Sequence, residues 1–234
     1  MKQYTATAND EGVRLSRFVQ SVTRDFPTSL LYKSFRNKRI KVNGKKGVPE
    51  DRIKAGDLIE LYINDEFFPP EGAKPTRKPA PKKQQNQPKV TVIYEDENIL
   101  LCDKPVGMVV HEDNDNTSDT LINRIKCYLW KKGEYDPDSE RSFAPALCNR
   151  IDRNTAGLVI AAKNAEALRD MNATIRDRGI SKLYLAACHG FFEKKQGTMT
   201  AYLEKNAAEN KVFVRTKAGE NTKTAALRYR VIDE

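Results

Sequence analysis

The feature that most constrains this chain of 234 residues is a stretch that cannot contribute to a packed core, residues 66–89, EFFPPEGAKPTRKPAPKKQQNQPK. It holds six prolines and six basic residues, with almost no apolar side chain after Phe68. Proline removes backbone hydrogen-bond donors and keeps such a segment extended, so this composition is typical of a linker. We therefore predict two folded parts, a small domain over residues 1–65 and a larger domain over residues 90–234.

The excess positive charge of the chain lies in the small domain and the linker. Residues 1–89 carry 19 Lys and Arg against 10 Asp and Glu, whereas residues 90–234 carry 22 of each. A basic segment joined to a neutral one indicates a polyanionic partner, and nucleic acid is the leading candidate. The alternative is a solvated charged surface that binds nothing.

The small domain has the pattern of an α/β unit. Apolar residues in 15–22 recur at the i, i+3, i+4, i+7 spacing of an amphipathic helix, and a second helix is predicted from Pro27. Short strands are predicted around the Asn43-Gly44 turn and after Gly56. The basic residues concentrated at the end of the second helix are the candidate RNA-binding residues: Lys33, Arg36, Lys38, Arg39 and Lys41.

The larger domain alternates strands with helices. Strands are predicted over 90–94, 99–102 and 158–162, and helices over 120–130 and 164–178. Further strands are predicted over KLYLAACHGFF (182–192) and through the remainder of the chain. The predicted fold class is α+β, a largely antiparallel mixed sheet with flanking helices, preceded by the small α/β RNA-binding domain.

Several classes of protein are excluded by composition. No apolar run approaches the ~18 residues of a membrane span, and the N-terminus MKQYTATANDEG has no apolar signal region. The four cysteines are widely spaced and only two histidines accompany them, so we expect reduced thiols, no metal site and no disulfide framework. We expect a cytoplasmic protein that does not bind membranes and favour a monomer.

The stretch NRIDRNTAG, residues 149–157, is the candidate catalytic segment. Asp152 lies between Arg150 and Arg153 in a polar loop ahead of a buried strand, a frequent location for site residues. Neighbouring arginines favour an ionised carboxylate, as a carboxylate nucleophile requires. A structural salt bridge to either arginine explains the same residues, and the local sequence by itself favours that simpler interpretation. No second carboxylate or histidine lies nearby to indicate a glycosidase pair, another Asp-dependent hydrolase or a metal centre.

Two resemblances to known families favour the catalytic interpretation of Asp152 over the structural one. VRLSRFVQ, SLLYKSFRNKRIKVNGKK and IKAGDLIELYI together resemble the small α-L RNA-binding domain first seen in a ribosomal protein. KPVGMVVH (104–111), NRIDRNTAG with LVIAAK (149–163) and SKLYLAACHG (181–190) resemble, in order and spacing, the RluA-type RNA pseudouridine synthases. The first resemblance implies docking on structured RNA by backbone shape.

The second resemblance implies an isomerase of uridine that needs no cofactor and no metal. Asp152 would be the nucleophile, Tyr184 would stack on the target uracil and assist removal of its C5 proton, and Arg150 would meet a phosphate or fill the space of the flipped nucleotide. The implied substrate is large-subunit ribosomal RNA, with transfer RNA as the alternative. KPVG would form a structural turn lining the cleft.

This sequence departs from the family pattern at three places. Asn149 and Ala156 stand where the family has histidine and serine. Similar proteins also continue past the region matching KTAALRYRVIDE into strands that carry a basic partner for the catalytic aspartate, whereas this sequence stops at Glu234. The second hypothesis is therefore an RNA-binding protein, a truncated or degenerate synthase that does not isomerise uridine.

Overall fold

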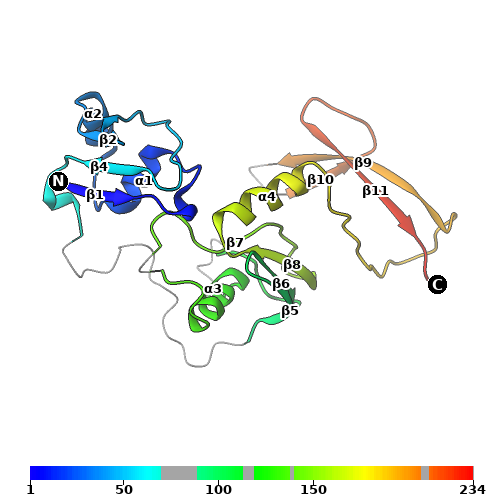
Figure 1. Ribbon diagram of the computed structural model, residues 1–234. Helices are drawn as coiled ribbons and strands as arrows, with labels where there is room; N and C mark the ends of the chain where they lie inside the picture. The colour runs from blue at the N-terminus through cyan, green and yellow to red at the C-terminus, as the bar shows by residue number, and fades with distance from the viewer. Residues whose placement is uncertain (70–88, 113–118, 138–139, 207–210, 234) are drawn as a thin grey trace. The chain divides into compact units, whose positions relative to one another are not determined.

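The computed structural model describes residues 1–69, 89–112, 119–137, 140–206 and 211–233 (Figure 1). They form two compact units, Met1–Ser181 and Lys182–Glu234. Most of the expected linker, residues 70–88, lies outside the described residues. No helix in the described part of the chain has both the length and the apolar character needed to cross a bilayer.

The first unit begins with a small antiparallel sheet, and residues 1–69 are called the N-terminal module from here on. Its strands lie in the order β1-β4-β2-β3, with bounds Lys2–Thr5 (β1), Leu58–Leu61 (β4), Ile40–Val42 (β2) and Lys45–Lys46 (β3). Its helices are α1 (Leu15–Val22), α2 (Thr28–Arg36) and the short 3-10 segments η1 (Ala8–Asp10) and η2 (Asp65–Phe67). The two helices and strands β2, β3 and β4 agree with the elements expected from the apolar spacing and the turn residues, whereas β1 and the 3-10 segments were not predicted.

The core of the N-terminal module lies between its helices and its sheet. Leu15, Phe18 and Val19 of α1 are fully buried, as their helical spacing predicts, together with Ile40 and Leu61 of the strands. Phe68 is also buried in this cluster. The packed chain therefore continues past Asp65, and the domain boundaries drawn from the sequence stay predictions.

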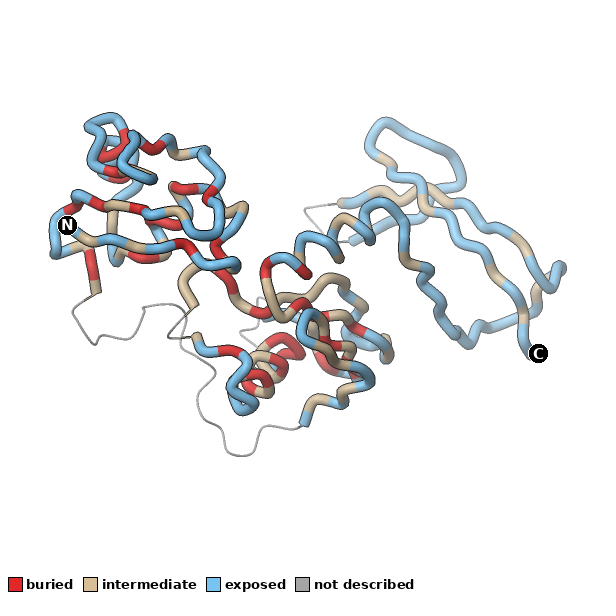
Figure 2. The backbone as a smooth tube through the Cα atoms, viewed as in Figure 1, coloured by how far each residue is buried: buried red, intermediate tan, exposed pale blue. Residues whose placement is uncertain are grey.

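A second antiparallel sheet completes the first unit. Its strands lie in the order β5-β6-β8-β7, with bounds Thr91–Glu95 (β5), Ile99–Lys104 (β6), Gly157–Ala162 (β8) and Ala146–Leu147 (β7). The helices of this part are α3 (Leu121–Lys131) and α4 (Ala165–Arg176). Ile125 and Leu129 of α3 pack against Leu100 and Val159 of the sheet, which gives this part its own core. Figure 2 shows the two cores as separate groups of buried residues.

The second unit contains a three-stranded antiparallel sheet of order β10-β9-β11, with bounds Gln196–Asn206 (β9), Lys211–Arg215 (β10) and Thr222–Arg230 (β11). None of its described residues is buried (Figure 2). The strand expected over residues 182–192 is wrong, because these residues have no regular structure. Leu183 and Leu185 are 93% and 87% exposed. An apolar sequence forms a strand only when neighbouring strands pair with its backbone, and no strand in the described part of the chain does so here.

All pairs between the described strands are antiparallel, and helices accompany them, which confirms the α+β class. Asn164, the residue before α4, caps that helix as expected, since its side chain accepts a hydrogen bond from Ala167 N at 2.8 Å. α4 follows β8 after a turn of two residues, Lys163 and Asn164, so its position is set by the central strands of the second sheet.

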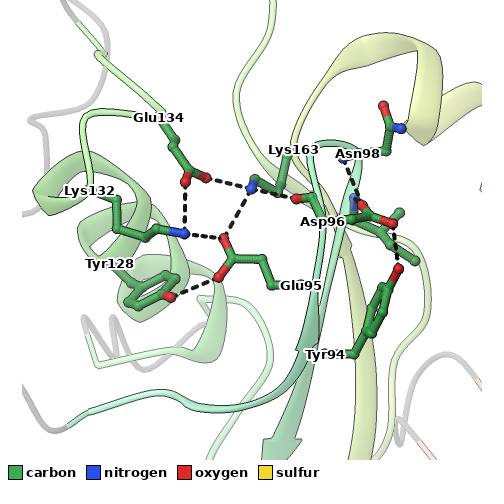
Figure 3. A network of polar contacts seen from close by, with 9 residues as sticks. Tyr94, Glu95, Asp96, Asn98, Tyr128, Lys132, Glu134 and Lys163 are labelled. Atoms are coloured by element: carbon green, nitrogen blue, oxygen red, sulfur yellow. Dashed lines mark hydrogen bonds and ion pairs between the residues drawn. The ribbon is translucent and has the colours of Figure 1, made fainter.

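A network of charged groups braces the second sheet at the end of β5 (Figure 3). The carboxylate of Glu95 accepts hydrogen bonds from Lys132 at 2.9 Å, Lys163 at 3.0 Å and Tyr128 at 2.8 Å. Both lysines also pair with Glu134. Because Tyr128 lies on α3 and Lys163 follows β8, the network ties β5, the helix and β8 together. Burial raises the pKa of Glu95, but the three donors outweigh it and hold the pKa at about 2.

We predict that Glu95→Gln lowers the free energy of unfolding near pH 7 by roughly 2 kcal/mol. The folded-state pKa of Glu95 lies below its ordinary value of 4.5, so its stabilisation is present above about pH 4.5 and is lost as the pH falls toward 2. Urea denaturation across this range measures the effect, with the exposed neighbour Glu97→Gln as control. The prediction fails if the Glu95 variant keeps the acid dependence of the unchanged protein.

Candidate functional site

The candidate site is built on the loop that joins β7 to β8 and carries Asp152. The first part of this loop is fastened to β8. Cys148 N donates to Ile160 O at 2.8 Å, and the Asn149 side chain both accepts from Ile160 N at 2.8 Å and donates to Leu158 O at 3.3 Å. Asn149, one of the departures from the family pattern, thus satisfies backbone groups of the strand on which the site is built.

The middle of the loop is fastened to the KPVG segment that follows β6. Gly107 N donates to Arg153 O at 2.8 Å, and Arg153 Nε donates back to Gly107 O at 3.1 Å. Gly107 has φ +85°, a conformation that glycine adopts without strain. The turn expected at Pro105 and Gly107 is therefore present, and it supports the loop that carries Asp152.

Lys104 begins the KPVG segment, which the sequence predicted to be a structural turn, but the role of its own side chain was not predicted. Its side chain is fully buried at the end of β6, and its ammonium donates to Pro105 O at 3.0 Å, Met108 O at 2.9 Å and Arg153 O at 3.2 Å. Burial lowers the pKa of Lys104, and the negative charge of Asp152 partly opposes this. The available signal was a lysine at the end of an apolar strand just before a Pro-x-Gly turn.

Asp152 itself is exposed at the turn of this supported loop. Its backbone carbonyl accepts from Thr155 N at 3.1 Å, which closes the turn. Among the residues that the structure describes, no donor forms a hydrogen bond or ion pair with its carboxylate. Neither Arg150 nor Arg153 forms the salt bridge that the simpler interpretation of the sequence requires. The carboxylate is therefore available to a ligand.

Arg150 is exposed two residues before Asp152. Partial burial, together with the charges of Arg150 and Lys126, lowers the pKa of His111 at the end of the KPVGMVVH segment. The two sequence motifs of the first unit are thus close enough to interact electrostatically. Tyr184 belongs to the second unit, where its side chain is 66% exposed, and its place in a site with Asp152 stays a prediction.

The candidate RNA-binding residues form one basic segment at the end of α2 and the start of β2, in which all but the half-buried Lys41 are exposed. None of them makes an ion pair with any residue in the described ranges, and the ammonium of Lys41 lies 5.1 Å from the centre of the Tyr62 ring. α2 ends at Arg36, and Lys38 adopts φ +57° beyond it, which turns the chain back into β2. The members of this basic segment are Lys33, Arg36, Lys38, Arg39 and Lys41.

The described residues contain no group of three or more His, Cys, Asp or Glu side chains placed to hold a metal ion. The arrangement that they do contain is an available carboxylate on a supported loop, a buried ammonium beside it and a separate basic segment.

Comparison with known proteins identifies the family. The model of the RNA pseudouridylate synthase family matches residues 98–234, which include the Asp152 loop and the KPVG segment. The chain belongs to this family. An uncharacterised RNA pseudouridine synthase of Mycoplasma pneumoniae is 32% identical over 213 residues, which cover 91% of this chain and 63% of that protein.

Ribosomal large subunit pseudouridine synthase C of Escherichia coli is 29% identical over 213 residues, which cover 90% of this chain and 61% of that protein. The chain thus spans less than two thirds of the length of either relative. The solved structure of human RNA pseudouridylate synthase domain containing 1 aligns with a TM-score of 0.46 at 17% identity, over 60% of this chain and 51% of that one.

We predict that Lys104→Met lowers the free energy of unfolding by roughly 2–4 kcal/mol, because three backbone carbonyls lose their common donor while the volume of the side chain is nearly kept. Chemical denaturation measures this loss. Lys54→Met, which changes an exposed lysine in the same way, is the control and should stay within about 0.5 kcal/mol. Equal stability of the two variants would contradict a structural role for Lys104.

Proposed function

We propose that this chain is the part of an RNA pseudouridine synthase that carries the nucleophile and a basic RNA-binding module. The reaction is the isomerisation of uridine to pseudouridine in structured RNA. The observation that carries the proposal is the available carboxylate of Asp152, on a supported loop, inside the region matched by the family. The substrate that we propose is large-subunit ribosomal RNA, as the name of the Escherichia coli relative states for that protein.

In the proposed reaction Asp152 attacks the target uridine, either at the anomeric carbon of the sugar or at C6 of the ring. The bond between N1 of uracil and the sugar breaks, the base turns, and C5 forms the new bond to the sugar. The bond between Asp152 and the nucleotide breaks as well, and its electron pair returns to Asp152, which restores the free carboxylate. The C5 proton is then removed, with Tyr184 assisting, and N1 ends up protonated. Substrate and product are isomers, so the balance requires no oxidant, reductant or other co-reactant.

The target nucleotide has to leave its stack for this chemistry, because the reacting bond is inaccessible inside a helix. Arg150, exposed beside Asp152, is the proposed contact for a phosphate or for the space left by the flipped base. The two groups are held on the same supported loop, which limits the reorganisation needed when RNA binds.

The N-terminal module is proposed as an α-L RNA-binding domain that recognises the shape of the RNA backbone. The five residues of its basic segment form no ion pair with any described residue, so their charges are available to phosphates. Unpaired cations on this segment also favour a second candidate function, RNA binding without isomerisation. The two candidates differ only in whether Asp152 reacts.

We predict that Asp152→Asn reduces isomerisation on the order of 10³-fold or more, because the amide is not a nucleophile, while RNA affinity stays nearly unchanged. Release of tritium from RNA labelled at C5 of uridine measures the reaction, and filter binding measures the affinity. Asp170→Asn, at an exposed position of α4, is the matched control. No release by the unchanged chain would favour the binding protein, and equal loss of affinity in the Asp152 variant would assign that residue a structural role.

We predict that replacing Lys38, Arg39 and Lys41 by glutamine weakens RNA binding and flattens its dependence on salt. Each phosphate contact contributes about 0.7–0.9 to the slope of log affinity against log salt concentration, so the slope should fall by about 2–3. The matched control exchanges the same residues while keeping charge, as Lys38→Arg, Arg39→Lys and Lys41→Arg, and should keep the slope. An unchanged slope in the neutral variant would remove this segment from the RNA-binding surface.

A further inference from the structure

The N-terminal module contacts the part of the first unit that carries Asp152 through a loop and through the end of β1. This docking loop, Thr7–Gly12, includes η1 and joins β1 to α1. It lies against two segments that are distant in the sequence, the beginning of α4 and residues 140–142. These contacts fall outside the RNA-binding segment and the Asp152 loop, so neither explains them.

Asn9 of the N-terminal module caps α4, the helix that follows β8 of the second sheet. Its side-chain oxygen accepts from Ala165 N, the first residue of α4, at 3.2 Å, and its side-chain nitrogen donates to Glu140 at 2.8 Å. The first amides of a helix have no partner within the helix. Asn164 satisfies one of them, at Ala167, and Asn9 satisfies another from 156 residues away. Since both ends of the Asn9 amide are used, its orientation on α4 is specified.

Asp10, beside it, is only 1% exposed. Its carboxylate accepts from Thr7 N at 2.8 Å, from Thr7 Oγ1 at 2.9 Å and from the hydroxyl of Ser142. A carboxylate removed from water is costly unless donors replace its hydration. The single hydroxyl hydrogen of Ser142 is shared between Asp10 and Asn9 O, which lies 3.2 Å from the Ser142 oxygen, so this side chain holds the docking loop against residues 140–142.

Two arginines extend the contact on either side. Arg169 Nη1, one helical turn along α4, donates to Glu11 O at 2.7 Å. Arg141 Nη1 donates to Thr5 O at 3.0 Å, and its guanidinium lies 5.1 Å from the centre of the Tyr4 ring. Tyr4 in turn packs edge-on against Phe18 of the module core, with ring centres 6.0 Å apart. The contact therefore reaches from the core of the module to the second turn of α4.

We infer that this interface holds the N-terminal module in one orientation on the part that bears Asp152 and thereby determines which uridine is selected. The path from the docking loop to the site runs through α4 and β8, which are regular elements, and β8 begins directly after the Asp152 loop. RNA bound by the basic segment then reaches Asp152 only at a set separation. This specificity role rests on the proposed function, whereas the docking itself does not.

The test compares two asparagines that cap the same helix. Asn9→Ala, combined with Ser142→Ala, removes contacts between the module and the other part, whereas Asn164→Ala removes a cap without touching the module. The first readout is hydrogen exchange of the Ala165 amide by NMR on the full chain without RNA. We expect slow exchange in the unchanged chain and in Asn164→Ala, and faster exchange in the Asn9 and Ser142 variant.

The second readout is the kinetics of tritium release from a long structured RNA and from a short stem-loop around the same uridine. We expect the Asn9 and Ser142 variant to raise KM for the long RNA about tenfold with kcat unchanged, because one anchored module no longer concentrates the second site on the RNA. The short stem-loop should be processed equally by all variants, because it does not engage both parts.

The outcomes separate the two proposals. An unprotected Ala165 amide in the unchanged chain overturns the docking whatever the enzyme does. An equal rise in KM for Asn164→Ala overturns the specificity role, because helix capping alone would then explain it. Absence of tritium release in every variant overturns the proposed function and with it the specificity role, while the exchange of Ala165 still decides the docking.

Discussion

The candidate site depends on the hydrogen bonds that the ammonium group of Lys104 donates to three backbone carbonyls. This ammonium is buried, and its three N–H groups donate to backbone carbonyls of two loops, one after β6 and one after β7. The acceptor in the second loop, Arg153 O, is 49 residues from Lys104 in the sequence. A buried charge is tolerated when every donor has an acceptor, and an ammonium has three donors to place. These hydrogen bonds join the two loops and fix the backbone beside Asp152, while the side chain of Asp152 stays exposed.

Polar contacts from two parts of the chain also meet at the start of α4, which is capped by Asn164, the residue before it, and by Asn9 of the N-terminal module. A helix that follows directly from β8 therefore carries, at one end, a contact with the module that holds the basic segment. Polar interfaces of this kind are weaker than apolar ones per unit area, but they specify orientation because their geometry has to be met.

Most secondary structure could be predicted because it depends on residues close in sequence. The helical spacing of Leu15, Phe18 and Val19 and the cap at Asn164 are visible in the letters and present in the structure. The strand expected over residues 182–192 fails for the opposite reason, since a strand depends on partners that its own residues do not specify. The segment is apolar, as the prediction assumed, but its backbone has no described strand beside it with which to pair.

The sequence by itself determined the linker composition, the segregation of basic charge, the α+β class and the position of Asp152 in a polar loop before a buried strand. Only the tertiary structure decided that Asp152 has no salt bridge to its neighbouring arginines, that Lys104 supports its loop, and that Asn9 caps α4. The physical reason is that composition and periodicity determine structure over a few neighbouring residues. A polar side chain, in contrast, could pair with any of many donors or acceptors that are distant in the sequence. Which acceptor a buried donor finds is settled when segments 49 and 156 residues apart are brought together.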